Sequence, residues 1–170
     1  HYLLLKVLEA NQLKLDDIAV VYLPPSDARA AFEKGAVDPW VIWDPFYAAA
    51  EKQLGAKVLA TGQNLVSNHQ FYLADREFAQ QHPELLKTVV NELNTTTTWV
   101  AQHQNEAAQL LEKATGLDSA ILKTSISRMG FGVKPITAQV AKEQQFVADA
   151  FYQQKLIPNK INIQAAILAH

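Results

Sequence analysis

Residues 18–45 read IAVVYLPPSDARAAFEKGAVDPWVIWDP, and this stretch decides the fold class. Its first six residues are β-branched or apolar and end at two prolines, which predicts a strand. The helix that follows has Ser26 or Asp27 as its cap and Gly35 as its stop. The second apolar run, Trp40–Trp43, predicts a strand that is covered on both faces. Strands separated by a helix of this length predict parallel pairing in an α/β layer.

The same alternation continues on both sides of this stretch. Before it, apolar residues at helical spacing predict a helix over Tyr2–Ala10. After it, an Asp-Pro pair starts a helix that ends at Gly55, and short β-rich runs at 57–60 and 70–74 predict two further strands. We therefore expect residues 1–75 to form the α/β portion of the fold.

From Arg76 onward the pattern changes to one helix after another. Apolar faces, capping residues and glycine stops predict helices over about 83–101, 105–115, 119–128 and 137–154. We expect residues 76–170 to form a C-terminal helical region that packs on the lobe and hinge of a larger fold.

The composition excludes several classes of function. The 170 residues are 49% hydrophobic and 19% charged, as in a globular protein. Fifteen basic and 17 acidic residues, with no basic run, do not favour nucleic-acid binding. The absence of cysteine excludes disulfides, and the histidines, His170 among them, lack the paired spacing of a zinc site. Since no nucleophile elbow or metalloprotease motif is present either, we expect neither an enzyme nor a cofactor.

A longer set of residues carries a resemblance to a known family. The run LPPSDARAAF at 23–32, the WVIWDP at 40–45, the FYLA at 71–74 and the final stretch from Phe151 to Ile161 resemble the SsuA/NMT1-like solute-binding proteins. Within that family, the chain looks most similar to the aliphatic sulfonate-binding component of an ABC transporter.

The resemblance implies a periplasmic-binding-protein-like (type II) architecture of two α/β lobes with the ligand in the cleft between them. It covers only the second lobe, with its parallel sheet and C-terminal helices, so the first lobe is expected to be largely absent. The implied protein is a periplasmic (extracytoplasmic) component that binds a small anionic ligand, an alkanesulfonate, and docks on ABC permease membrane subunits. Because the strand missing from the sheet would leave exposed edges, we expect the isolated chain to be oligomeric or accompanied by an N-terminal fragment.

Helix N-termini are the expected anion sites, because unpaired N–H groups and the positive end of the helix dipole converge there. Three such ends lie before Tyr2, at Ser26 and Asp27, and at the Asp-Pro pair 44–45. In the family, a turn before the first of these helices presents N–H groups to the anion, and His1 corresponds to the last residue of that turn.

Four further residues are candidates for ligand binding. Trp43 is predicted either to wall the cleft against an alkyl tail or to lie in the core. Asp44 caps its helix and, as an anion itself, more plausibly orders the donors of the site than touches a sulfonate. Asn68 is predicted to hydrogen-bond between lobes or to lie in solvent. Arg76 offers a planar donor fork to an anion, or else a surface salt bridge.

Three alternatives stay open at this point. Related receptors take nitrate or taurine instead of an alkanesulfonate. The same superfamily includes an enzyme that makes the pyrimidine precursor of thiamine with a pyridoxal cofactor and iron, but its cysteine-rich motif is missing here. A ligand-sensing domain of a transcription regulator with the same lobes is the third.

Overall fold

The computed structural model describes residues 1–168, which form two compact units. The first unit consists of His1–Asn11, Thr61–Asn94 and the chain from Val133 onward, and the second consists of Gln12–Ala60 and Thr95–Gly132. The chain passes between the units four times, once inside the helix α5 (Pro83–Gln102), so each unit is built from pieces that are separated in the sequence.

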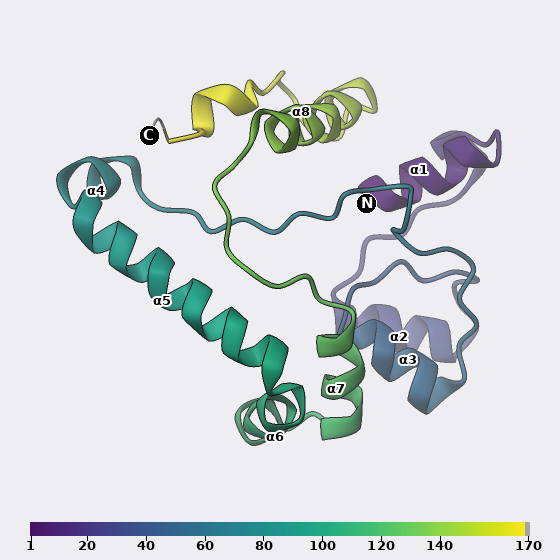
Figure 1. Ribbon diagram of the computed structural model, residues 1–170. Coiled ribbons are helices and arrows are strands. Elements are labelled where there is room, and N and C mark those ends of the chain that lie inside the picture. Colours follow the sequence, from purple (N-terminus) through teal and green to yellow (C-terminus); the bar gives the residue numbers. More distant parts are fainter. Residues whose placement is uncertain (169–170) are drawn as a thin grey trace. The chain divides into compact units, whose positions relative to one another are not determined.

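The first unit is held together by contacts of α8 (Ala138–Gln153), which packs against α1 (Tyr2–Ala10) and the 3-10 helix η2 (Ile163–Ala166; Figure 1). The amide of Gln145 on α8 fixes this C-terminal stretch, since Nε2 donates to Ile161 O at 2.8 Å and Oε1 accepts from Ile163 N at 2.9 Å. The unit also contains α4 (Arg76–Gln81) and the first part of α5 (Pro83–Gln102).

The second unit contains the 3-10 helix η1 (Leu15–Asp17), α2 (Pro25–Glu33), α3 (Phe46–Leu54), the end of α5, α6 (Gln104–Thr115) and α7 (Ser119–Ser127). Helix α7 is its centre, because α6 and α3 both pack against it (Figure 1). Between α6 and α7, Ala107, Ala108, Leu122 and Ile126 are buried, and Trp99, Val100, Leu117 and Phe131 pack around them. Between α3 and α7 the buried residues are Ala48, Ala49 and Ile121.

The predicted helices are confirmed together with most of their end signals. Asp118 caps α7 by accepting from Ala120 N and Ile121 N, and Thr137 caps α8 by accepting from Val140 N. Gly55 and Gly116 end α3 and α6 in the left-handed conformation, which glycine adopts without steric cost. The prediction for α2 was wrong in detail: the helix starts at Pro25, because a proline fits the first helical position, and Ser26 and Asp27 lie in its first turn.

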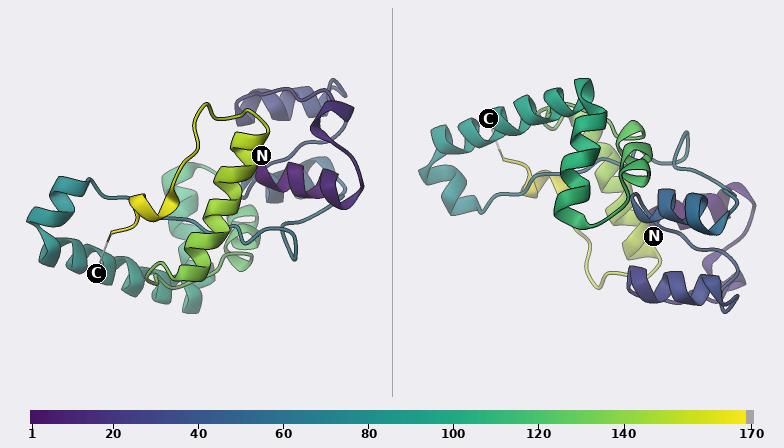
Figure 2. Two further views of the ribbon diagram at one scale, coloured as in Figure 1. Left: turned by 90° about the horizontal axis from the view of Figure 1, so that it is seen from above. Right: turned by 90° about the horizontal axis from the view of Figure 1, so that it is seen from below.

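The predicted parallel sheet is not confirmed. The segments 18–23, 40–43, 57–60 and 70–74 have no strand assigned within residues 1–168, and Figure 2 draws no arrow there. A strand is defined by ladder hydrogen bonds to a neighbour, and no neighbour is paired with these segments. Their apolar side chains are correspondingly uncovered, with Leu59 85% and Leu73 92% exposed. The helices found after Arg76 agree with the prediction for that region. The boundary between regions 1–75 and 76–170 stays a prediction. Residues 169 and 170, and with them His170, lie outside the described residues.

Over residues 1–168, every helix is too short or too polar to span a bilayer.

Candidate ligand-binding site

The turn that leads into α3 is the best-ordered of the predicted anion sites. Asp44 Oδ1 accepts from Ala48 N at 2.9 Å. The prediction that Asp44 is the N-cap was wrong by one residue: Pro45 is the N-cap of α3, and the Asp44 carboxylate bonds the first turn from the position before it. The preceding carbonyl, Trp43 O, accepts from Tyr47 N at 3.0 Å, and Pro45 O accepts from Ala49 N at 2.9 Å. Because three consecutive N–H groups of the first turn are already bonded, this helix end offers few backbone donors to a ligand.

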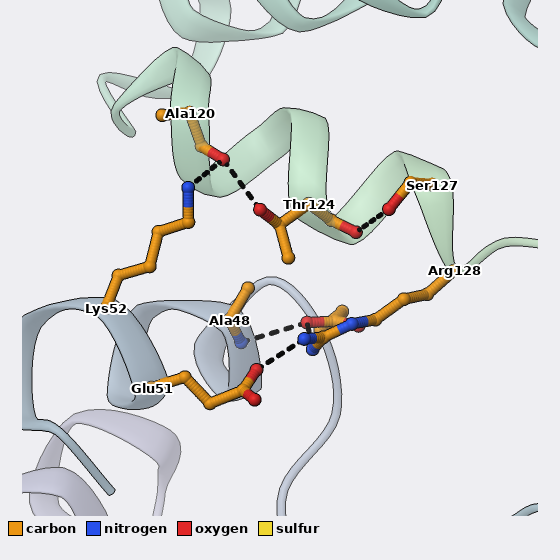
Figure 3. A network of polar contacts seen from close by, with 8 residues as sticks. Ala48, Glu51, Lys52, Ala120, Thr124, Ser127 and Arg128 are labelled. Atoms are coloured by element: carbon orange, nitrogen blue, oxygen red, sulfur yellow. Dashed lines mark hydrogen bonds and ion pairs between the residues drawn. The ribbon is translucent and has the colours of Figure 1, made fainter.

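Arg128, which directly follows α7, contacts this turn although it lies far from it in the sequence (Figure 3). Its Nη1 lies 3.4 Å from Asp44 Oδ1, and its Nη2 donates to Glu51 Oε2 at 2.5 Å. The guanidinium also lies over the ring of Tyr47, 4.1 Å from the ring centroid, in a cation–π contact. We call Asp44, Tyr47, Glu51 and Arg128 the arginine cluster.

The arginine cluster is partly screened from water, which strengthens its charge interactions. Burial raises the pKa of the Tyr47 hydroxyl. The Glu51 carboxylate also raises this pKa, whereas the positive charge of Arg128 lowers it. Although burial alone lowers the pKa of Arg128, the hydrogen bond to Glu51 and the attraction of Asp44 raise it above its ordinary value. The guanidinium is therefore charged at every physiological pH.

A second tie holds α3 against α7 on the same side as the cluster. Lys52 Nζ donates to Ala120 O at 2.8 Å (Figure 3). The Lys52 ammonium thus bonds a backbone carbonyl of α7, whereas Arg128 pairs with the carboxylates of Asp44 and Glu51. Sequence reasoning missed Arg128 and Glu51 as functional candidates. An arginine at a helix end carries no local signal when its partners lie 77 and 84 residues away.

Trp43 directly precedes Asp44 in the chain. The side chain is 63% exposed, and the ring makes an edge contact with Phe46 at a centroid distance of 6.2 Å. The predicted alternative, that Trp43 lies in the core, is therefore wrong for this structure. An exposed indole next to an ordered turn is suited to cover an apolar ligand tail.

The other three predicted residues, His1, Asn68 and Arg76, belong to the first unit. His1 packs edge-on against Phe151 at a centroid distance of 5.6 Å. Asn68 has a left-handed backbone, with φ of 49°, in the exposed loop before the FYLA segment. Arg76 Nη2 donates to Ala165 O at 2.8 Å, which makes it a tie to the C-terminal stretch.

Helix α1 differs from α3 in the state of its first turn. Leu5 N donates to His1 O, whereas no protein acceptor within residues 1–168 receives the N–H groups of Tyr2, Leu3 and Leu4. Every helix start leaves such donors, so the binding of an anion at the start of α1 stays a prediction.

The first unit also has a shallow hollow of about 300 Å³ beside α1, lined by Tyr2, Asn64, Leu65, Val66, Ser67, Glu143 and Phe146. Glu143 is its charged group. A hydrogen bond from Gln139 and a second one with His69, at 2.9 Å, hold the pKa of the Glu143 carboxyl below its ordinary value. A carboxylate that stays ionised repels a sulfonate, so this hollow does not suit an anionic ligand. No group of side chains within the described part of the chain is arranged to hold a metal ion.

Comparison with known proteins gives the same family as the sequence. A putative aliphatic sulfonates-binding protein of Escherichia coli (strain K12) is 38% identical over 168 residues, which are 98% of this chain and 53% of that protein. The chain spans about half the length of the curated relatives it matches.

Two solved structures are similar to the chain. One is the alkanesulfonate-binding protein SsuA from Xanthomonas axonopodis pv. citri bound to MOPS, at 35% identity and a TM-score of 0.90 over 98% of this chain and 58% of that one. The other is the periplasmic aliphatic sulphonate binding protein SsuA from Escherichia coli, at 37% identity and a TM-score of 0.90 over 99% of this chain and 55% of that one. The sequence model of the NMT1-like family matches residues 1–113. The chain belongs to the NMT1-like family.

Proposed function

We propose that the protein is the extracytoplasmic substrate-binding component of an ABC importer and binds an aliphatic sulfonate in a cleft between lobes. The observation that carries this proposal is the match of 98% of the chain to proteins named for sulfonate binding, in sequence and in structure. Its partners are then an alkanesulfonate and the permease subunits in the membrane, and its location is the periplasm. The matched relatives are binding proteins, which favours a receptor over an enzyme.

We propose that the ligand-binding residues are those predicted from the sequence, in the following roles. Trp43 covers the alkyl tail, because its ring is exposed beside an ordered turn. Asp44 orders that turn, because its carboxylate is bonded to Ala48 N and paired with Arg128. His1 stands at the start of α1, whose free N–H groups are suited to the sulfonate oxygens. Asn68 and Arg76 are polar candidates of the first unit.

The same proposal accounts for the unpaired extended segments. We propose that 18–23, 40–43, 57–60 and 70–74 become strands of a parallel sheet when the rest of the binding-protein fold is present. Their apolar side chains, such as Leu59 and Leu73, would then be covered instead of exposed. The solved structures are longer than this chain, and that additional length is the source we propose for the missing sheet partners.

Calorimetry on the product of the complete gene tests the function. We expect heat of binding with ethanesulfonate and much less with taurine, in which the terminal carbon of the same tail carries an ammonium group. Trp43→Ala should weaken ethanesulfonate binding on the order of tenfold, because burying an aromatic surface against a short tail contributes roughly 1–2 kcal/mol. The control is Phe78→Ala, which removes an exposed aromatic ring on α4, outside the segments proposed to become strands. Trp99→Ala is unsuitable because that ring packs in the core.

Heat with nitrate or with a thiamine precursor, and none with any sulfonate, would replace this proposal by one of the alternative receptors. Turnover of a pyridoxal cofactor by the purified protein would replace it by the enzyme of the same superfamily.

A further inference from the structure

One carboxylate on α8, that of Glu143, ties down the loop 61–70 of the same unit. Its Oε2 lies 2.9 Å from Nε2 of His69, and the hydroxyl of Ser67 is a further donor to this carboxylate. A third donor, Gln139 Nε2, lies 2.6 Å from Oε1 but belongs to α8 itself. The loop is therefore attached to the helix at two residues, one on each side of residue 68.

Asn68 lies between these two attached residues and has an unusual backbone. Its φ of 49° falls in the left-handed region, which asparagine adopts more readily than most residues but which still costs free energy. Residues in such conformations persist where their surroundings fix them, and they cluster at ligand-binding sites. Because Ser67 and His69 both interact with Glu143, the carboxylate supplies this fixation.

The loop also lies beside the start of α1. Tyr2, the first residue of that helix, lines the same hollow of about 300 Å³ as the loop residues from Asn64 to Ser67. The first turn of α1 supplies the N–H groups that we propose for the sulfonate oxygens, so Asn68 follows directly on a part of the loop that reaches this turn. Asn68 is not among the residues that line the hollow, whereas Glu143 is. The sulfonate is therefore not placed in the hollow, where the carboxylate would repel it.

We propose that Glu143 is a positioning residue for sulfonate binding: through Ser67 and His69 it holds Asn68 in its left-handed conformation, so that the side-chain amide is preorganised to donate to a sulfonate oxygen. A loop that is ordered before the ligand arrives lowers the entropic cost of binding. The inference rests on the proposed function, because it concerns the same ligand. Glu143 acts through Asn68 and is not assigned a contact with the sulfonate.

The bond that Asn68 makes sets the upper limit of the effect. Asn68→Ala removes a hydrogen bond to a charged group and should weaken binding on the order of tenfold. Glu143→Ala leaves Asn68 in place but frees the loop. If the competent conformation is then populated about a third of the time, the dissociation constant rises about threefold. In the Asn68→Ala background, Glu143→Ala should not change the affinity further, because the two residues act on one bond.

The experiment measures two quantities on the product of the complete gene. Calorimetry gives the dissociation constant of ethanesulfonate, and mass spectrometry gives the hydrogen-exchange rates of the loop amides. The amides of Leu65 and Val66 report on the loop, since both donate to Gly62 O. Glu143→Ala should raise these exchange rates about threefold or more, because the loop opens more often.

The conservative variant separates positioning from charge. Glu143→Gln removes the charge but keeps an oxygen that accepts from His69, so it should recover most of the affinity and of the exchange protection that Glu143→Ala loses. If the negative charge itself governed binding, both variants would bind the anion more tightly than the parent protein. Tighter binding in both would therefore overturn the inference.

Gln139→Ala is the matched control. Gln139 donates to the same carboxylate from within α8, and it makes no hydrogen bond to the loop within residues 1–168. Its affinity and exchange rates should equal those of the parent protein. If Glu143→Ala does not fold, His69→Ala decides, since it removes an attachment from the side of the loop and should weaken binding in the same way.

Each remaining outcome has a fixed meaning. A parent protein that binds ethanesulfonate, with Glu143→Ala binding equally well, overturns the inference and leaves the proposed function in place. A Glu143→Ala variant that weakens binding by the same factor in the Asn68→Ala background also overturns it, in favour of a general structural role. A parent protein that binds no sulfonate overturns both.

Discussion

Asp44 offers the sharpest separation of a capping role from a charge role. In the structure its Oδ1 accepts from Ala48 N at 2.9 Å and lies 3.4 Å from Arg128 Nη1. Asp44→Ala removes both interactions, whereas Asp44→Asn keeps an oxygen that can accept from Ala48 N and removes the charge. The two variants therefore differ in the cap alone.

The magnitudes follow from these contacts. Loss of a capping side chain costs about 1 kcal/mol, with a range of roughly 0.5–2. The pair with Arg128 is half-exposed and shared with Glu51, so its loss costs about 0.2–1 kcal/mol. We expect Asp44→Ala to lower the free energy of unfolding by about 1.2–2 kcal/mol and Asp44→Asn by less than about 1 kcal/mol.

Thermal unfolding of the complete gene product, followed by circular dichroism, measures this difference. Each kcal/mol lowers the Tm by roughly 2–4 °C in a protein of about 150–250 residues, and by less in a longer one. Equal Tm values for Asp44→Ala and Asp44→Asn would refute the capping argument, and an unchanged Tm in both would refute the whole account of this turn. Ser26→Ala, at an α2 residue with no capping bond, should leave the Tm unchanged.

Three further predictions concern other parts of the chain. Ile126→Ala, which empties a site only 2% exposed between α6 and α7, should lower the free energy of unfolding by about 2–5 kcal/mol in denaturant titration, and a loss below about 1 kcal/mol would contradict the packing described. Because the pKa of Glu143 is lower in the folded protein than its ordinary value of 4.5, its ionised carboxylate stabilises the fold above pH 4.5, and this stabilisation is lost as the pH falls through the folded pKa. The difference in free energy of unfolding between the parent protein and Glu143→Gln should therefore shrink as the pH falls through this range. A difference that does not change with pH would contradict the prediction. The isolated 170-residue chain should be oligomeric in light scattering because side chains such as Leu73 are uncovered, and a monodisperse monomer would argue against unpaired strands.

The helices were predictable because their signals are local. Gly55 and Gly116 stop α3 and α6, and Asp118 and Thr137 cap the helices that follow them, all within a few residues of the helix ends. The α2 start was misplaced by a short distance, since Pro25 competes with Ser26 for the same turn.

The predicted sheet and the arginine cluster depend on partners that no local pattern identifies. The run 18–23 has the composition of a strand, but a strand forms only when another segment supplies its ladder hydrogen bonds. Arg128 pairs with Asp44 and Glu51, which lie 84 and 77 residues away in the sequence. Arg76 was predicted as a donor to an anion or a salt bridge, and its fork instead reaches a carbonyl 89 residues away.

The buried positions of the second unit have a consequence for how this protein tolerates change. Ala48 and Ala108 are 0% and 2% exposed where helices meet, so the backbones of α3, α6 and α7 approach each other closely. Such sites have no space for even one more methyl group, and enlarging them costs typically 1–3 kcal/mol through displaced helices. In laboratory evolution, substitution of these alanines by larger residues should therefore be tolerated less often than substitution of large exposed side chains by smaller ones.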